Sequence, residues 1–169
     1  ETLEDRFRRG MEVRTRIGGG TLASSVPLTN EMVPDLHRIA AEMLFGSIWS
    51  RPALDVKRRE MCTLSVLTAL ERENQLRAHV SGSLNQGLTA EEIIEVFVHV
   101  GLYVGVPAAF NAVELASGVF DSRGIHHEAL RAHDGTQDPE LLYRQGMARR
   151  AELLGQDGLA DPDRDFPTE

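Results

Sequence analysis

One apolar run near the middle of the chain constrains the fold more than any other feature. Ile93 to Val106 is almost entirely apolar, yet Glu95 and His99 interrupt it with the four-residue spacing that places side chains on one helical face. The preceding Thr89-Ala90-Glu91-Glu92 is a capping box, a sequence that begins helices. The run is too short to span a bilayer. It therefore predicts a buried helix inside a folded domain.

Other segments show the same helical spacing with recognisable ends. Asp55 is a suitable N-cap, and Pro107 fits the first turn of a helix. No segment alternates in the manner of a strand, and only 5% of the residues are aromatic. The fold class expected is therefore all-α, a bundle of about six helices. The expected helices are Leu3–Ile17, Met32–Phe45, Val56–Leu70, Glu73–Asn85, a helix from the capping box to about Gly105, and Pro107–Phe120.

Length and charge narrow the classes of function. A chain of 169 residues suits one domain with a real core. The net charge of −8 argues against nucleic-acid binding, because no basic field is available to displace phosphate counterions. Cys62 is the only cysteine, which excludes an internal disulfide and a CxxC redox centre. We expect a cytoplasmic protein without a membrane segment, since residues 1–20 are rich in charge and unlike a signal peptide.

The two ends of the chain share a short repeat. The segment Phe7-Arg8-Arg9-Gly10-Met11, with Arg14, recurs 136 positions later as Tyr143-Arg144-Gln145-Gly146-Met147, with Arg150. A match this short can arise by chance; otherwise it marks a second docking arm or the start of a second unit. The domain organisation predicted is a helical domain over 1–125, a linker over 126–140 and a C-terminal arm over 141–169.

Three polar residues lie on apolar helix faces and are the catalytic candidates. Glu60 shares a stripe with Leu64 and Leu67, where a carboxylate is costly unless it is paired or protonated. His79 lies on an apolar seam, and His99 could be oriented by Glu95. Each also has a plain structural interpretation: a solvated helix start for Glu60, a satisfied core histidine for His79 and a buried polar pair for His99.

A metal or organic cofactor is not expected. Glu60, His79 and His99 would together supply two histidines and a carboxylate, a set used for iron, but nothing in their spacing demands a metal. The glycines at 18–20 lack the strand–turn–helix context of a phosphate-binding loop.

Ordered sequence matches over residues 49–112 resemble the carboxymuconolactone decarboxylase family. The matching pieces are Trp-Ser-Arg-Pro at 49–52, Arg59-Glu60, Ala-Leu-Glu-Arg-Glu at 69–73, Gln-Leu-Arg-Ala-His at 75–79, Leu-Asn-Gln-Gly-Leu-Thr at 84–89, Glu-Glu-Ile at 91–93, Tyr-Val-Gly-Val-Pro-Ala-Ala at 103–109 and Asn-Ala at 111–112. The arm at 6–16 also looks like the family's N-terminal lead-in.

The resemblance implies an alkylhydroperoxidase D-like helical fold that assembles into a ring, a homo-oligomer such as a trimer or hexamer. In the related peroxidases a CxxC precedes the histidine, and those two cysteine positions fall on Arg72 and Gln75 here. Cys62 is in the wrong place. Thiol peroxidase activity is therefore not expected.

The activity implied is cofactor-free decarboxylation of 4-carboxymuconolactone, a small anionic lactone of aromatic catabolism in the β-ketoadipate pathway. On this hypothesis His79 donates to the carbonyl or supplies the proton, Glu60 orients it, and His99 lines the pocket. The candidate substrate-binding residues are Arg51, Arg72, Arg77, Trp49 and Tyr103. Two alternatives stay open: a related lactone- or ketoacid-processing enzyme recruited to another pathway, and a non-enzymatic oligomeric protein of the same fold.

Overall fold

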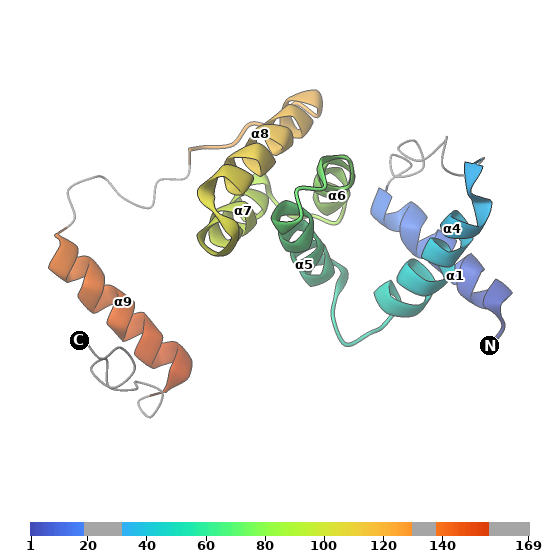
Figure 1. Ribbon diagram of the computed structural model, residues 1–169, viewed down its shortest axis with the longest axis horizontal. Helices are drawn as coiled ribbons and strands as arrows, with labels where there is room; N and C mark the ends of the chain where they lie inside the picture. Colours follow the sequence, from blue (N-terminus) through green and yellow to red (C-terminus); the bar gives the residue numbers. More distant parts are fainter. Residues whose placement is uncertain (19–31, 130–137, 156–169) are drawn as a thin grey trace. The chain divides into compact units, whose positions relative to one another are not determined.

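The computed structural model describes residues 1–18, 32–129 and 138–155, and these residues are helical without strands. They divide into two compact units, Glu1–Glu128 and Ala129–Glu169. The elements, of which Figure 1 labels the α-helices, are α1 (Leu3–Gly18), α4 (Pro34–Ile39), the π-helix η1 (Ala40–Trp49), α5 (Val56–Ala69), α6 (Glu73–Asn85), α7 (Ala90–Val104), α8 (Val106–Ser122) and α9 (Pro139–Leu154). The all-α prediction is confirmed for the described part of the chain. Residues 130–137 of the expected linker and 156–169 of the expected arm lie outside the described residues.

The helix ends follow the capping signals of the sequence. The Asp55 side chain accepts the backbone N–H of Arg58 at 2.9 Å and begins α5. Both hydrogen bonds of the capping box are present at the start of α7, from the Glu92 N–H to Thr89 Oγ1 and from the Thr89 N–H to the Glu92 carboxylate. Because four backbone N–H groups at each helix start lack helical partners, such caps fix where α5 and α7 begin.

The prediction of one α-helix over Met32–Phe45 is wrong in the type of helix and in the position of its C-terminal end. Here α4 is short and passes directly into η1, which runs to Trp49. A side-chain bond across the wide turns, from Ser47 Oγ to the Glu42 carbonyl at 2.8 Å, accompanies the π geometry. Helical periodicity in the sequence does not distinguish α from π winding. Stretches of π-helix are often found at functional sites, and η1 ends at Trp49, a predicted site residue.

Two glycines bring α1 into close contact with η1. A Cβ added at Gly10 would lie 1.9 Å from the Ala41 carbonyl oxygen, and one at Gly46 would lie 2.2 Å from the Arg6 carbonyl oxygen. Backbone therefore packs against backbone at both positions, which only glycine allows. The contact encloses a small apolar cluster: Val13, Ile17, Phe45 and Trp49, with Val56 and Ala78 packed against it.

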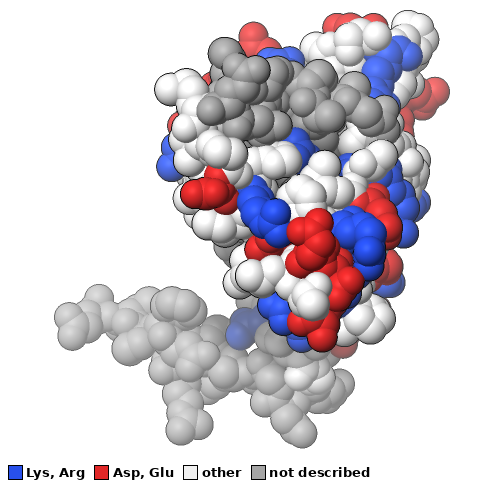
Figure 2. Space-filling view, turned by 90° about the vertical axis from the view of Figure 1, so that its right-hand side faces the viewer, with Lys and Arg blue, Asp and Glu red and all other residues white. Residues whose placement is uncertain are grey.

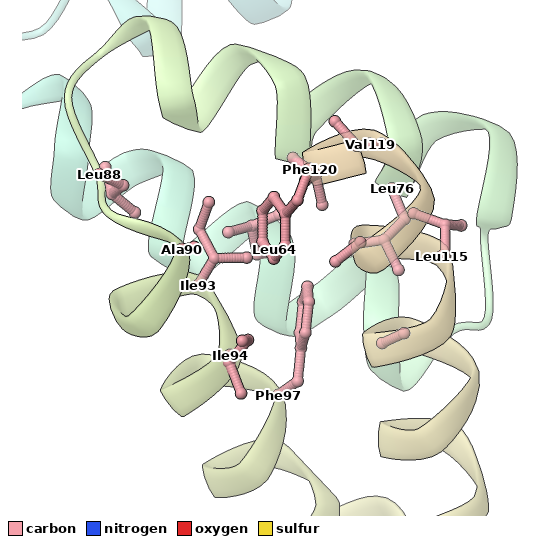
Figure 3. Close-up of a cluster of buried hydrophobic side chains, with 13 residues drawn as sticks. Leu64, Leu76, Leu88, Ala90, Ile93, Ile94, Phe97, Leu115, Val119 and Phe120 are labelled. Carbon is pink, nitrogen blue, oxygen red and sulfur yellow. The ribbon is translucent and has the colours of Figure 1, made fainter. Parts of the chain in front are cut away.

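A larger core joins α5, α6, α7 and α8 (Figure 3). Phe97 and Phe120 are its largest fully buried side chains, and Leu64 contributes from α5. The labelled side chains converge from these helices on one another, as the apolar stripes at helical spacing require. Its buried members are Leu64, Leu76, Val80, Leu88, Ala90, Ile93, Ile94, Phe97, Ala112, Leu115, Ala116, Val119 and Phe120. The α5–α6 pair thus stands between this core and the cluster on α1 and η1.

The surface carries charges of both signs. On the face shown in Figure 2, lysine and arginine side chains are interleaved with aspartates and glutamates. No helix in the described ranges is long and apolar enough to cross a membrane.

Candidate functional site

Glu60 is the polar centre of the site. It lies in the first half of α5, and its side chain is fully buried. The sequence predicted this direction from the stripe that Glu60 shares with Leu64, which is also fully buried. A carboxylate removed from water is costly unless hydrogen bonds replace its hydration, so its partners decide what it can do.

His79 provides the main partner of that carboxylate. Its Nδ1 lies 2.9 Å from Glu60 Oε2, although the two residues are nineteen positions apart. A tight reversal between α5 and α6 makes the contact possible, and within it Glu71 adopts a left-handed φ of 51°. The His79 side chain is 12% exposed whereas that of Glu60 is inaccessible. His79 can therefore contact a ligand, whereas Glu60 can act on that ligand only through His79.

A serine also faces the Glu60 carboxylate. Ser83, one turn after His79 on α6, is fully buried, and its Oγ lies 3.4 Å from Glu60 Oε2. Both donors thus reach the same oxygen. Among the described residues, no hydrogen bond reaches the other oxygen, Oε1. A Cβ added at Gly82 would lie 3.4 Å from Oε1 and 3.1 Å from Cγ2 of Ile17, so α1 covers this side of the carboxylate.

Trp49 places the end of η1 against the histidine. The ring centroids of Trp49 and His79 are 5.9 Å apart at an interplanar angle of 33°, and Phe45 supports Trp49 at 5.8 Å. This contact limits the orientations open to the imidazole ring. The site thus draws side chains from α5, α6, η1 and α1.

The third catalytic candidate lies elsewhere. His99 is exposed on α7, where its ring stacks on exposed Tyr103 with centroids 5.2 Å apart. Among the described residues, no hydrogen bond joins it to Glu95, and no contact joins it to Glu60 or His79. Periodicity alone could not distinguish the face toward the core from the other apolar face of α7.

The predicted substrate-binding arginines remain on the surface. Arg51, Arg72 and Arg77 are all exposed. The buried arginine is instead Arg14 on α1, whose Nη1 contacts Nε2 of His37 on α4. Burial lowers the pKa of Arg14, and burial together with the Arg14 charge lowers the pKa of His37. The sequence offered one signal for Arg14: it belongs to the repeated arm motif.

The arrangement is suited to proton transfer. Across the described residues, no three histidine, cysteine, aspartate or glutamate side chains come together in a metal-binding geometry. An imidazole held at Nδ1 by a carboxylate leaves Nε2 to donate or accept a proton, which is the arrangement of general acid–base catalysis. Cys62 is exposed and unsuited to a thiol relay with a second cysteine.

Comparison with known proteins places this chain in a family. The sequence pattern of the carboxymuconolactone decarboxylase family matches residues 34–118. The 4-carboxymuconolactone decarboxylase of Acinetobacter baylyi is 36% identical over 128 residues, 75% of this chain and 96% of that protein. The chain belongs to the carboxymuconolactone decarboxylase family. A second member, the nitrosuccinic acid decarboxylase of Metarhizium robertsii, is 30% identical over 112 residues, 63% of this chain and 76% of the relative. Both of these relatives are named as decarboxylases.

Proposed function

We propose that this chain is a decarboxylase for a small dicarboxylate that carries its own electron sink, with a carboxylated unsaturated lactone such as 4-carboxymuconolactone as the first candidate. The observation that carries the proposal is the contact between buried Glu60 and partly exposed His79, within a family whose named relatives are decarboxylases.

The chemistry of such a lactone supplies the electron sink. The bond between the ring carbon and the departing carboxylate breaks, and CO2 leaves. The electron pair moves through the ring double bond into the lactone carbonyl and forms a dienolate. A proton then adds at the α carbon and leaves the double bond shifted. The protein has to stabilise the developing oxyanion and deliver one proton.

In this proposal Glu60 orients the imidazole, and His79 donates the hydrogen bond or the proton. Glu60 accepts the Nδ1–H of His79, so Nε2 is the ring nitrogen presented to substrate. As an imidazolium, His79 donates from Nε2 to the carbonyl oxygen as charge develops there, or delivers the proton to carbon. The Glu60 carboxylate and the Trp49 ring both lie against the imidazole and hold its orientation. The apolar cluster beside Trp49 keeps water from the departing carboxylate.

The second carboxylate of the substrate needs a cation. Arg51, Arg72 and Arg77 are the proposed candidates, because each guanidinium is exposed and its planar fork matches a carboxylate. Arg77 lies near the surface of α8, with Nη1 3.8 Å from where a Cβ on Gly118 would stand.

A second candidate substrate follows from the Metarhizium robertsii relative. Nitrosuccinic acid carries two carboxyl groups and a nitro group, and the nitro group can take the electron pair of a departing carboxylate as a nitronate. The demands on the protein are the same: an acid at the carbon, a donor at the oxyanion and a cation for the remaining carboxylate. A Glu60–His79 pair serves both substrates.

We also propose that the chain forms a homo-oligomer through α7 and α8. Large apolar side chains are exposed there: Val98, Leu102, Tyr103, Val106 and Phe110. An exposed apolar surface of this kind is typical of an interface. His99 and Tyr103 would then belong to a subunit contact. Sedimentation of wild type and Leu102→Glu tests this, and equal masses at the monomer value would contradict it.

Turnover of both substrates tests the proposed function. Chelator-treated protein is incubated with 4-carboxymuconolactone or nitrosuccinic acid, and loss of substrate is followed together with released CO2. We expect turnover of one of them, with a loss of about a hundredfold or more in His79→Ala and in Glu60→Gln. His99→Ala is the matched control and should keep most of the activity. No CO2 release by wild type from either substrate would contradict the proposal.

A further inference from the structure

Ser83 occupies a position where an apolar residue would be expected. The buried stripe of α6 runs Leu76, Val80, Ser83, and the hydroxyl of Ser83 is as inaccessible as the Val80 side chain. A buried hydroxyl without a partner is unfavourable, and in a helix interior serine commonly bonds to the carbonyl four residues earlier. Here the Ser83 hydroxyl is directed to Glu60 instead.

The two donors of α6 converge on one oxygen. Nδ1 of His79 lies 2.9 Å and Oγ of Ser83 lies 3.4 Å from Glu60 Oε2, while Oε1 is turned toward Gly82 and Ile17. We propose that Ser83 is a positioning residue: its hydroxyl fixes Oε2 opposite Nδ1 of His79 and so leaves Nε2 as the reacting nitrogen. The expected effect on kcat rests on the proposed function, whereas the expected effect on the His79 tautomer does not.

Within residues 1–18, 32–129 and 138–155, His79 and Ser83 are the residues whose side chains lie within hydrogen-bond distance of this carboxylate. From α1 comes Ile17, with Arg14 one turn earlier and in contact with His37 on α4. From η1 comes Trp49, while Glu42 is paired with Arg38. The buried faces of α7 and α8 toward α5 consist of apolar residues and glycine.

The expected kinetic effect follows from the hydrogen bond. The hydroxyl holds Glu60 Oε2 opposite Nδ1 of His79, so Ser83→Ala lets the carboxylate turn and leaves the imidazole less well oriented. Since the bond is long, we expect a loss of about fivefold to tenfold in kcat with KM unchanged.

The test compares Ser83→Ala, Ser83→Thr and Ser81→Ala. Ser81 lies on the same helix, but its Oγ accepts from Arg123 rather than facing Glu60, so its removal is a matched control. Ser83→Thr keeps the hydroxyl and should restore the wild-type kcat. Thermal unfolding of each variant shows whether the fold is retained. Equal kcat values for wild type, Ser83→Ala and Ser81→Ala would overturn the proposal.

A readout without substrate separates this proposal from the proposed function. In wild type, the ¹⁵N shifts of the His79 ring above neutral pH should report one tautomer, with the proton on Nδ1. Ser83→Ala should give a mixture with the Nε2–H tautomer, and Ser83→Thr should return to one. An unmixed Nδ1–H tautomer in Ser83→Ala would contradict the positioning role even if wild type is an active decarboxylase. A mixture would support the role even if neither substrate is turned over.

Discussion

Replacing Gly10 by alanine should loosen the N-terminal helix and damage the site from a distance. The added Cβ would lie 1.9 Å from the Ala41 carbonyl oxygen, so α1 and η1 must separate by about 1.3 Å to restore ordinary contact. Overpacking of this kind costs about 1–3 kcal/mol, and the better helix propensity of alanine returns about 1 kcal/mol. Because the clash is with backbone, which cannot rotate away, we expect a net loss of about 2 kcal/mol.

Urea unfolding followed by tryptophan fluorescence measures this loss directly. Trp49 is the only tryptophan in the chain and lies in the cluster that α1 covers. Gly146→Ala is the matched control, since Gly146 occupies the equivalent place in the repeated motif on α9 and an added Cβ there meets nothing within 4 Å. We expect Gly146→Ala to leave the Trp49 transition unchanged. Equal stability of Gly10→Ala and wild type would refute the close backbone contact.

Three further predictions concern other parts of the chain. Burial and the Arg14 charge lower the pKa of His37 in the folded state, so the unfolded chain binds more protons. The unfolding free energy of wild type should therefore fall as pH drops below the ordinary pKa of 6.5. His37→Gln should make the unfolding free energy less dependent on pH in this range. Denaturation at several pH values checks this, and an equal pH dependence in both proteins would contradict it. Thr89→Ala removes the capping box of α7 and should cost about 1 kcal/mol in thermal unfolding; no change would show that the cap is dispensable. Cys62→Ser should leave decarboxylation intact, and loss of turnover would indicate thiol chemistry.

Local signals predicted most helix boundaries because their causes lie in adjacent residues. The expected bounds of α6, Glu73–Asn85, are those observed, and α5 and α7 begin after the predicted caps. Glu60 was predicted to face inward from its spacing with Leu64, and it does. The sequence did not reveal the π winding of η1, which depends on how α1 packs on it rather than on a local residue pattern.

The site was harder to predict because its contacts join residues distant in sequence. No spacing rule brings His79 within 2.9 Å of Glu60; the family resemblance suggested that they work together, and the α5–α6 reversal brings them into contact. Ile17 of α1 and Oε1 of Glu60 both border Gly82, an arrangement of three distant segments that periodicity does not predict. His99 looked equivalent to His79, because both interrupt apolar faces, and only tertiary packing shows that one is half-buried and the other exposed.

The central claim is that Glu60 and His79 act as one catalytic unit, and a double-mutant cycle tests it most directly. The kcat of wild type, Glu60→Gln, His79→Ala and the double variant is measured on whichever substrate wild type decarboxylates. Groups that act together are strongly non-additive, so the double variant should be about as slow as His79→Ala alone. If the two losses instead multiply, or if either single variant keeps the wild-type rate, the pair is not the catalytic unit.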